Sequence, residues 1–550
     1  MRQWFRSGTP WIWLTAAAVS ASLIMVIGLV SLIAIRGLGY FWPGEVLDIQ
    51  YRDADHHTVR IIGERYDEER VSASRLRESG VDLTTNAEQI ERYLIKTGNR
   101  DVGGLDFRWL IEPDITTIER PGDVAVIERR EWGNLYGFLI ALKQGGQVVA
   151  EGDQAWPALA QRLDRARDLF AQIRAVQKEA MGEVNHGLEK LRLRERMLEI
   201  RGENDPERRL EIVAQRQELA ARYADLEQRL VGLSEAIARD SIVVQTADGG
   251  IVEVPLAKTV RIFRPNSMGP TGKIAHYLEK LWEFVSDDPR EANTEGGIFP
   301  AIFGTVLMVI IMSVIVTPFG VIAAVYLREY ARQGVVTRLI RIAVNNLAGV
   351  PAIVYGVFGL GFFVYFVGGG IDQWMFPESL PAPTFGTPGI LWASLTLAIL
   401  TLPVVIVATE EGLARIPRSI REGSLALGAT KAETLWRTVL PMASPAMMTG
   451  LILAVARAAG EVAPLMLVGV VKLAPSMPLD GDFPFLHLDR KFMHLGFHIY
   501  DVGFQSPNVE AARPLVYATA LLLVLVILVL NLAAIAIRNR LREKYRSLES

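Results

Sequence analysis

Apolar residues are concentrated in six long runs, and one long polar stretch separates the first run from the other five. Each run has about 20 or more residues, which is the length a helix needs to cross a bilayer. The runs are Trp11–Ile35, Ile298–Leu327, Gly349–Gly370, Pro388–Ala408, Ala446–Val471 and Pro514–Ile537. This pattern predicts a polytopic, mainly α-helical membrane protein with six transmembrane helices. The first run is longer than the roughly 7–15 apolar residues of a signal peptide, so we expect it to be a retained anchor.

Basic residues indicate how these helices are oriented. They collect after the second span, after the fourth span and in the C-terminal tail, and none lies between the third and fourth spans. They are Arg328, Arg332, Arg338 and Arg341; Arg415, Arg418, Arg421, Lys431 and Arg437; and Arg538, Arg540, Arg542, Lys544 and Arg546. Because cytoplasmic loops carry the excess of Lys and Arg, we expect both termini to be cytoplasmic. The polar stretch then lies outside.

Four segments follow from this topology. Residues 1–36 hold the N-terminal cytoplasmic end and the first transmembrane helix, and residues 37–297 form a soluble α+β insert on the external, periplasmic side. Residues 298–537 form a core of five transmembrane helices, and residues 538–550 form a cytoplasmic tail. Long loops are translocated largely regardless of charge, so the many arginines of the insert do not contradict this orientation.

The insert combines strand and helix patterns. Alternating apolar residues and a turn signal predict strands at Asp123–Arg130, Leu135–Lys143, Ser241–Thr246 and Ile251–Pro255. Residues 157–239 between them have the pattern of a long helical hairpin of coiled-coil type. Its apolar seam is Leu219, Tyr223, Leu226, Leu230, Leu233 and Ile237. Such a hairpin acts either as a spacer or packing arm, or as an arm that docks a partner.

An amphipathic segment closes the insert at Ile274–Val285. Its apolar face is formed by Ile274, Tyr277, Leu278, Leu281, Trp282 and Val285. Two placements fit this pattern: a helix that lies in the membrane interface before the second span, or a buried helix of the insert.

Composition excludes several functions. The net charge of −3 argues against a nucleic-acid-binding protein. The absence of cysteine excludes disulfides, thiol catalysis and cysteine-ligated metal sites. No G-x4-G-K-[ST] phosphate-binding loop, H-E-x-x-H or G-x-S-x-G motif occurs, so we expect no catalytic residues, no metal site and no ATPase activity in this chain.

The predicted cytoplasmic segment 409–441 carries a spaced motif. Glu422 is followed by Gly428 six residues later and by Leu440-Pro441 after eleven more residues. This spacing is typical of a short helix, a tight turn at the glycine and a second helix, because glycine adopts left-handed conformations that close a helix. Proline then restricts the chain where it re-enters the membrane.

This motif resembles the EAA loop of ABC importer permeases, which sits in a cleft of the ATPase subunit and transmits its closure. Gly423 and Ser424 stand where that family has two alanines, and Thr438 stands where it has isoleucine. The resemblance assigns ATPase coupling to Glu422, Gly423, Ser424, Gly428, Ala429, Thr430, Lys431, Leu440 and Pro441.

Further segments resemble the PstA-type permease subunit of the phosphate ABC transporter. They are Pro318–Tyr330, Asn346–Gly356, Ala408–Gly412, Gly460–Leu465 and His494–Tyr500, within a resemblance that covers about Gly296–Tyr545. The resemblance implies a bacterial inner-membrane importer of inorganic phosphate that works by alternating access. It also implies a PstC-type permease, a PstB-type ATPase dimer that binds ATP and a PstS-type phosphate-binding protein as partners, with no cofactor in this chain.

Two charged residues lie in the predicted fifth span. Arg457 and Glu461 are four residues apart, so a helix brings them to one face. Each costs on the order of 2.5–3.5 kcal/mol at a helix centre, which is why intramembrane charges mark functional sites. We interpret the pair as part of the substrate pathway, where a guanidinium binds a phosphate group in bidentate fashion. The alternative is a structural ion pair between helices.

Two other functions remain open from the sequence. One is a permease for another oxyanion or small solute, such as molybdate, sulfate or phosphonate. The other is a membrane sensory receptor, which needs only two spans and a cytoplasmic signalling helix. The four additional spans and the loop motif argue against that receptor.

Overall fold

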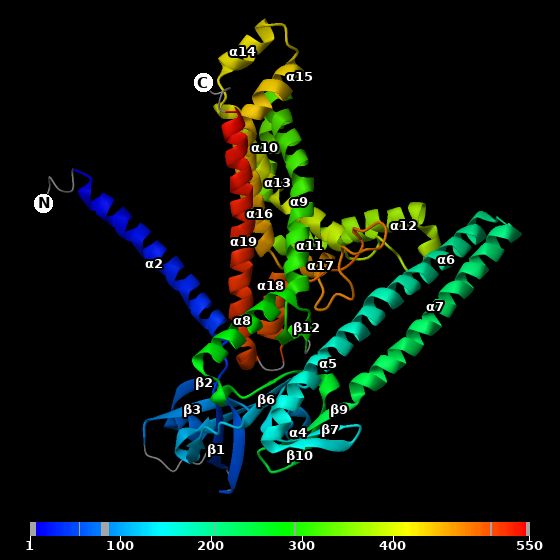
Figure 1. Cartoon of the computed structure of the whole chain (residues 1–550). Helices are drawn as coiled ribbons and strands as arrows, with labels where there is room; N and C mark the ends of the chain where they lie inside the picture. The colour runs from blue at the N-terminus through cyan, green and yellow to red at the C-terminus, as the bar shows by residue number, and fades with distance from the viewer. Residues whose placement is uncertain are drawn as a thin grey trace. The chain divides into compact units, whose positions relative to one another are not determined.

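The computed structural model describes residues 7–53, 56–78, 87–203, 205–290, 293–506 and 509–545, and Figure 1 labels their helices and strands. The chain divides into two compact units. The membrane unit consists of Met1–Tyr40, Val285–Asp288 and Ile298–Ser550, and the insert unit consists of Phe41–Phe284 and Pro289–Gly297. Residues 546–550 of the predicted tail lie outside the described residues.

The membrane unit is helical. Its helices are α2 (Thr9–Gly39), α9 (Phe299–Val325), α10 (Val335–Leu347), α11 (Ala352–Phe358), α12 (Gly369–Met375), α13 (Ile390–Arg415), α14 (Arg418–Ala426), α15 (Lys431–Thr434), α16 (Leu440–Gly460), α17 (Leu465–Val468), α18 (Leu495–Tyr500) and α19 (Val509–Tyr545). π-Helical segments extend α9 over Tyr326–Tyr330, join α11 to α12 over Gly359–Gly368, join α15 to α16 over Leu435–Val439 and follow α18 over Asp501–Gln505.

Six helical segments of the described chain are long and apolar enough to cross a membrane. They are Pro10–Gly39, Phe299–Tyr330, Ala352–Met375, Ile390–Arg415, Lys431–Gly460 and Ala512–Glu543. The prediction of a mainly helical, six-span protein is therefore confirmed. Five of these six segments overlap the predicted runs closely. The exception is the fifth span in chain order, Lys431–Gly460.

Helix α13 is the centre of the membrane unit, because most of its apolar length is buried against α9 and α16. Small residues allow this close packing. A Cβ atom at Gly320 of α9 would lie 2.6 Å from a methyl group of Val405, and one at Gly450 of α16 would lie 2.8 Å from the methyl group of Ala408. Helices in lipid associate through such small-residue contacts, since burial of apolar surface offers little gain there.

The fifth span was predicted wrongly at both ends. We expected Ala446–Val471, but the spanning helix runs from Lys431 to Gly460. The apolar residues after Gly460 fold back as irregular chain with the short helix α17, and Leu465, Val468 and Val470 are buried in the core of the unit. Hydropathy does not distinguish these cases, because non-helical chain is tolerated at membrane depth where protein covers it.

The insert unit contains two antiparallel sheets. The first has the order β4-β3-β2-β1-β5 and the second has the order β10-β9-β7-β6-β11, with β8 paired to β7. The strands are β1 (Val46–Arg52), β2 (Thr58–Ser72), β3 (Gln89–Lys96), β4 (Phe107–Ile111), β5 (Ile115–Glu119), β6 (Val124–Arg129), β7 (Asn134–Gln144), β8 (Gln147–Glu151), β9 (Asp240–Gln245), β10 (Ile251–Pro255) and β11 (Thr259–Phe263). A further pair, β12 (Pro289–Arg290) and β13 (Glu295–Gly296), lies near the end of the insert. All four predicted strands are confirmed as β6, β7, β9 and β10.

Helices complete the insert unit. They are α3 (Ala73–Glu78), α4 (Arg100–Gly103), α5 (Ala155–Ala175), α6 (Met181–Arg201), α7 (Pro206–Ala238) and α8 (Pro270–Ser286). Buried side chains of α5, such as Leu159 and Ala166, pack on the second sheet. Helices α6 and α7 pack against each other as a hairpin (Figure 1), in which the seam residue Leu226 is buried beside Val184. The coiled-coil character of this hairpin stays a prediction.

Candidate functional site

The predicted coupling segment forms two short helices joined by a glycine turn. Helix α14 ends in a Schellman motif, in which the Gly428 amide donates to the Leu425 carbonyl over 3.0 Å and the Ala429 amide donates to the Ser424 carbonyl over 3.2 Å. Gly428 has a φ of +91°, the left-handed conformation that such a motif requires. Thr430 then caps α15 in a reciprocal capping box with Glu433. The predicted helix–turn–helix is therefore confirmed.

Polar side chains hold the two short helices in place. The Ser424 and Thr434 hydroxyls are 2.9 Å apart and join α14 to α15. Arg421 donates to the Ile416 and Leu413 carbonyls over 2.7 and 2.8 Å and to the Glu329 carboxylate over 2.9 Å. These contacts tie α14 to the end of α13 and to the π-helical turn that follows α9.

Lys431 makes a second connection between the coupling segment and the turn after α9. Its ammonium donates to the Glu329 carbonyl and lies 4.5 Å from the centre of the Tyr330 ring. The sequence placed Lys431 in the coupling segment but did not indicate Glu329, Tyr330 or Arg421 as its partners. No local spacing signals these contacts, since Glu329 is 92 residues from Arg421 along the chain.

The coupling segment exposes two large apolar side chains. Leu427 is 91% exposed and Trp436 is 73% exposed, and Glu422 and Gly423 lie on the exposed surface of α14. In Figure 1, α14 and α15 lie together at the end of the membrane unit where α19 also ends. The helix α16 begins at Leu440 with Pro441 in its first turn, a position that tolerates proline.

Arg457 and Glu461 form the predicted ion pair, but not on a continuous helix. The Arg457 Nε atom lies 3.5 Å from a Glu461 carboxylate oxygen, and the two side chains are 32% and 24% exposed. Arg457 is in the last turn of α16, whereas Glu461 is the capping residue with extended backbone. The helix dipole favours a cation at this end. The pair therefore bridges a helix end and the irregular chain that follows, rather than lying at a helix centre as we expected.

The ion pair between Arg341 and Glu410 was not predicted. Arg341 of α10 donates to the Glu410 carboxylate over 3.2 Å, and its other contacts are the Gln333 side chain and the Leu327 carbonyl. A cavity of about 120 Å³ beside this pair is lined by Leu327, Arg341, Val344, Asn345, Ile406, Val407, Glu410 and Glu411. The fourth span was predicted to end at Ala408, but α13 continues to Arg415. Glu410 and Glu411 therefore lie on this helix. Arg457 and Glu461 do not line this cavity.

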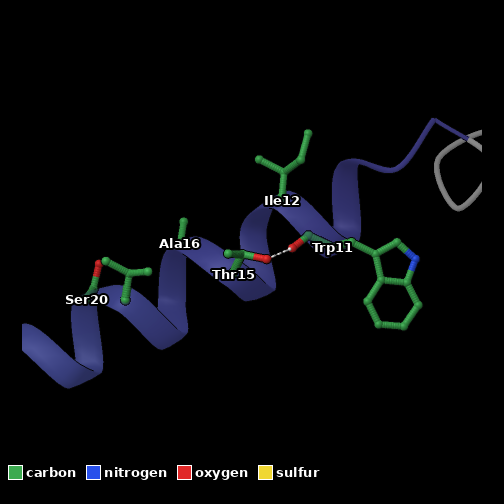
Figure 2. A pocket seen from close by; sticks show the side chains of 6 residues that line it. Trp11, Ile12, Thr15, Ala16 and Ser20 are labelled. Carbon is green, nitrogen blue, oxygen red and sulfur yellow. Dashed lines mark hydrogen bonds between the residues drawn. The ribbon is translucent and has the colours of Figure 1, made fainter. Parts of the chain in front are cut away.

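A larger hollow, of about 560 Å³, lies along α2. Figure 2 shows that its lining residues all project from this one helix, including Trp11, Ile12 and Ala16. The Thr15 hydroxyl donates to the Trp11 carbonyl over 2.7 Å, so its polar group is satisfied within the helix. Such a face suits lipid or a neighbouring helix. Among the described residues no group of three or more His, Asp or Glu side chains is arranged to hold a metal ion.

Comparison with known proteins places these features in a family. Residues 316–547 match the family described as the inner membrane component of binding-protein-dependent transport systems. PstA 1 of Mycobacterium tuberculosis, a phosphate transport system permease protein, is 35% identical over 244 residues, covering 44% of this chain and 70% of that protein. PstA of Yersinia pestis, with the same description, is 32% identical over 255 residues, covering 46% and 76% of the two chains. YqgH of Bacillus subtilis, a probable ABC transporter permease protein, is 31% identical over 195 residues, covering 35% of this chain and 59% of that protein.

The chain therefore belongs to the family of inner-membrane permease subunits of ABC transporters. Within this family it is a PstA-type permease, a multi-pass inner-membrane protein. Permease subunits of this kind are not enzymes themselves. The matched region begins after the insert unit, so the family does not account for residues 41–284.

Proposed function

We propose that this chain is the transmembrane permease subunit of an ATP-driven importer of inorganic phosphate. The observation that carries the proposal is the 35% identity over 244 residues with a phosphate transport system permease protein. The family match over residues 316–547 includes the membrane-unit helices from the end of α9 onward, the coupling segment and the Arg457–Glu461 pair, but not α2. These are the parts through which a permease binds its substrate and receives energy.

The chain works with separate subunits in this proposal. A PstB-type ATPase dimer binds and hydrolyses ATP and docks on the exposed coupling segment, where Leu427 and Trp436 offer apolar anchors. A PstC-type permease pairs with this chain, and a PstS-type binding protein delivers phosphate from outside. Both termini are cytoplasmic and residues 37–297 are periplasmic, because the basic short loops identify the cytoplasmic side.

The Arg457–Glu461 pair acts in the substrate pathway. Phosphate is a polyvalent anion that hydrocarbon excludes, and a guanidinium offers it two parallel N–H donors and a permanent charge. Glu461 competes with phosphate for Arg457, so the anion is released rather than trapped. Alternating access then exposes this pair to one side of the membrane at a time, as closure of the ATPase dimer moves the coupling segments.

Uptake of radiolabelled phosphate by proteoliposomes that contain the complete complex tests the pathway. Arg457→Gln is expected to reduce uptake to background while the complex still assembles, because the neutral amide cannot hold a polyvalent anion. Arg542→Gln, at an exposed position of α19, is the matched control and should transport normally. Normal uptake by assembled Arg457→Gln would refute the pathway role.

A charge reversal separates the pathway role from the structural alternative. The double variant Arg457→Glu/Glu461→Arg keeps an ion pair between the same two positions but moves the cation out of the helix end. If the pair only connects the end of α16 to the chain that follows it, the double variant should take up more phosphate than either single variant. If Arg457 binds phosphate, uptake stays at background.

Competition assays identify the substrate. Excess unlabelled phosphate is expected to suppress the labelled uptake, whereas sulfate, molybdate and phosphonate leave it unchanged. Stronger suppression by one of these other anions would identify that anion, and not phosphate, as the substrate, without contradicting the ABC permease function. Failure to recover any ATPase subunit with the chain would contradict the whole assembly.

A further inference from the structure

Helix α8 of the insert unit buries Phe284 but leaves one row of apolar side chains exposed. Its apolar row, Ile274, Leu278 and Trp282, is exposed by 51%, 57% and 70%. Its polar residues His276 and Glu283 are buried instead. A helix on a water-facing surface buries its apolar stripe and exposes its charges. The apolar row of α8, defined by these three residues, therefore requires an apolar environment outside the insert unit.

An ionic network keeps the charged face of α8 inward. Arg261 of β11 lies 2.7 Å from the Glu279 carboxylate and 3.2 Å from that of Glu283. Lys280 donates to Glu128 of β6 over 2.9 Å. Burial raises the pKa of Glu128, but Lys280 and Arg261 outweigh this effect and lower it to about 2, so the carboxylate stays charged.

The network also excludes a simple rotation of the helix. Turning α8 to bury its apolar row would leave Arg261 and Glu128 without the partners that α8 supplies. Arg261 and Glu128 lie 3.2 Å apart and would still pair with each other, but the buried Glu283 carboxylate would lose Arg261 and Arg290, which is unfavourable. The exposed apolar row is therefore a stable feature of the insert unit.

The chain connects α8's part of the insert unit to a membrane-spanning helix through a short covalent link. The apolar helix α2 ends at Gly39, and Trp42 follows three residues later, at most about 11 Å further along the chain. The Trp42 ring contacts the Tyr277 ring of α8 at 5.9 Å between centres, and Phe41 contacts Phe284 at 5.0 Å. The chain that leaves the span is thus anchored directly on α8.

The side chains around the row suit the boundary between lipid and water. Trp42, Tyr277 and Trp282 lie on or beside α8, and Trp and Tyr are enriched at the headgroup level of membranes. We propose that α8 lies in the outer headgroup region of the bilayer, with Ile274, Leu278 and Trp282 inserted among the lipids. The insert unit is then seated on the membrane by this helix. The inference depends on the membrane-spanning character of α2 and not on the identity of the transported solute.

Site-directed labelling tests this seating on the full chain, which contains no natural cysteine. Ile274→Cys and Leu278→Cys are each labelled with the fluorophore NBD, in the assembled complex reconstituted into nanodiscs of phosphatidylethanolamine and phosphatidylglycerol. Ile251→Cys is the matched control, because Ile251 is an equally apolar side chain, 69% exposed, on strand β10. Quenching is measured with a headgroup spin-labelled lipid and with aqueous iodide.

The lipid quencher is expected to act at least about two-fold more strongly at positions 274 and 278 than at 251, and iodide to act more weakly there. Equal iodide quenching at all three positions would place the row in water and overturn the proposal. Protection from both quenchers would also overturn it, since a protein partner then covers the row. Two labelled positions guard against a local effect of either substitution.

Discussion

Replacing Gly428 by alanine tests whether the left-handed turn determines the conformation of the coupling segment. Gly428 has a φ of +91°, and a Cβ atom there would meet no other atom within 4 Å. The substitution therefore introduces no clash, and its whole cost comes from the backbone conformation. That cost is roughly 1–2 kcal/mol for an L-residue in the left-handed region.

The same segment offers a matched control. Gly423 lies within α14 and has equally open space around its Cβ position, but its backbone is helical. Gly423→Ala removes a helix-destabilising residue and is worth roughly 0.5–1 kcal/mol of helix stability in the opposite direction. Gly428→Asn is the rescue variant, because asparagine tolerates the left-handed conformation better than alanine does.

Hydrogen exchange of the purified complex measures these effects locally. A cost of 1–2 kcal/mol corresponds to a roughly 5- to 30-fold increase in the frayed population, so amides near the end of α14 should exchange faster by that factor in Gly428→Ala. They should exchange more slowly in Gly423→Ala, and at an intermediate rate in Gly428→Asn. Substrate transported per ATP hydrolysed should fall in parallel with fraying. Similar exchange in the two alanine variants, or no advantage of asparagine over alanine, would refute the reasoning.

Three further predictions concern packing, pH and the hairpin. Gly356→Ala should lower the melting temperature of the complex, because its Cβ atom would lie 2.7 Å from the Pro464 Cα atom, whereas Gly361→Ala meets no atom within 4 Å and should not. Acidification from pH 4.5 towards about 2 should destabilise the insert unit, and faster hydrogen exchange in β6 and β11 would show it. The pKa of Glu128 is about 2 in the folded chain, against an ordinary value of 4.5. The stability that the ionised carboxylate provides is therefore lost in this pH window. Glu128→Gln should remove that part of the pH dependence. Replacing residues 188–222 by a short Gly-Ser linker shortens the hairpin but keeps the buried Val184–Leu226 contact. Phosphate uptake should be unchanged if the hairpin is a spacer. Loss of uptake by a complex that still assembles would indicate a docking arm.

Features with local causes were predictable from the sequence. Long apolar runs indicate spanning helices because the bilayer imposes a minimum length, and six such helices are present in the described chain. The turn at Gly428 was predictable because a left-handed helix end favours glycine whatever surrounds it. The β9–β10 hairpin was predictable from its turn residues, among which Gly249 has a φ of +80°.

Features that depend on distant partners were not predictable. Hydropathy marked Val462–Val471 as part of a span, but whether such a stretch crosses lipid or folds back depends on the helices that cover it. Glu410 looked like the start of a loop because its partner Arg341 is 69 residues away along the chain. The contact of Arg421 with Glu329 was missed for the same reason.

Helix α8 shows most directly what could not be predicted from the sequence. Its pattern indicated two unlike faces but not which of them turns inward. Burying apolar side chains is the usual choice, since each gains roughly 1.5–3 kcal/mol when it leaves water. In this chain Arg261 and Glu128, supplied by two strands of the second sheet, pair with each other and with charged side chains of α8, and these contacts hold the polar side of the helix against the sheet. An amphipathic pattern indicates where the two faces of a helix lie, whereas the side chains of its neighbours decide which of them turns inward.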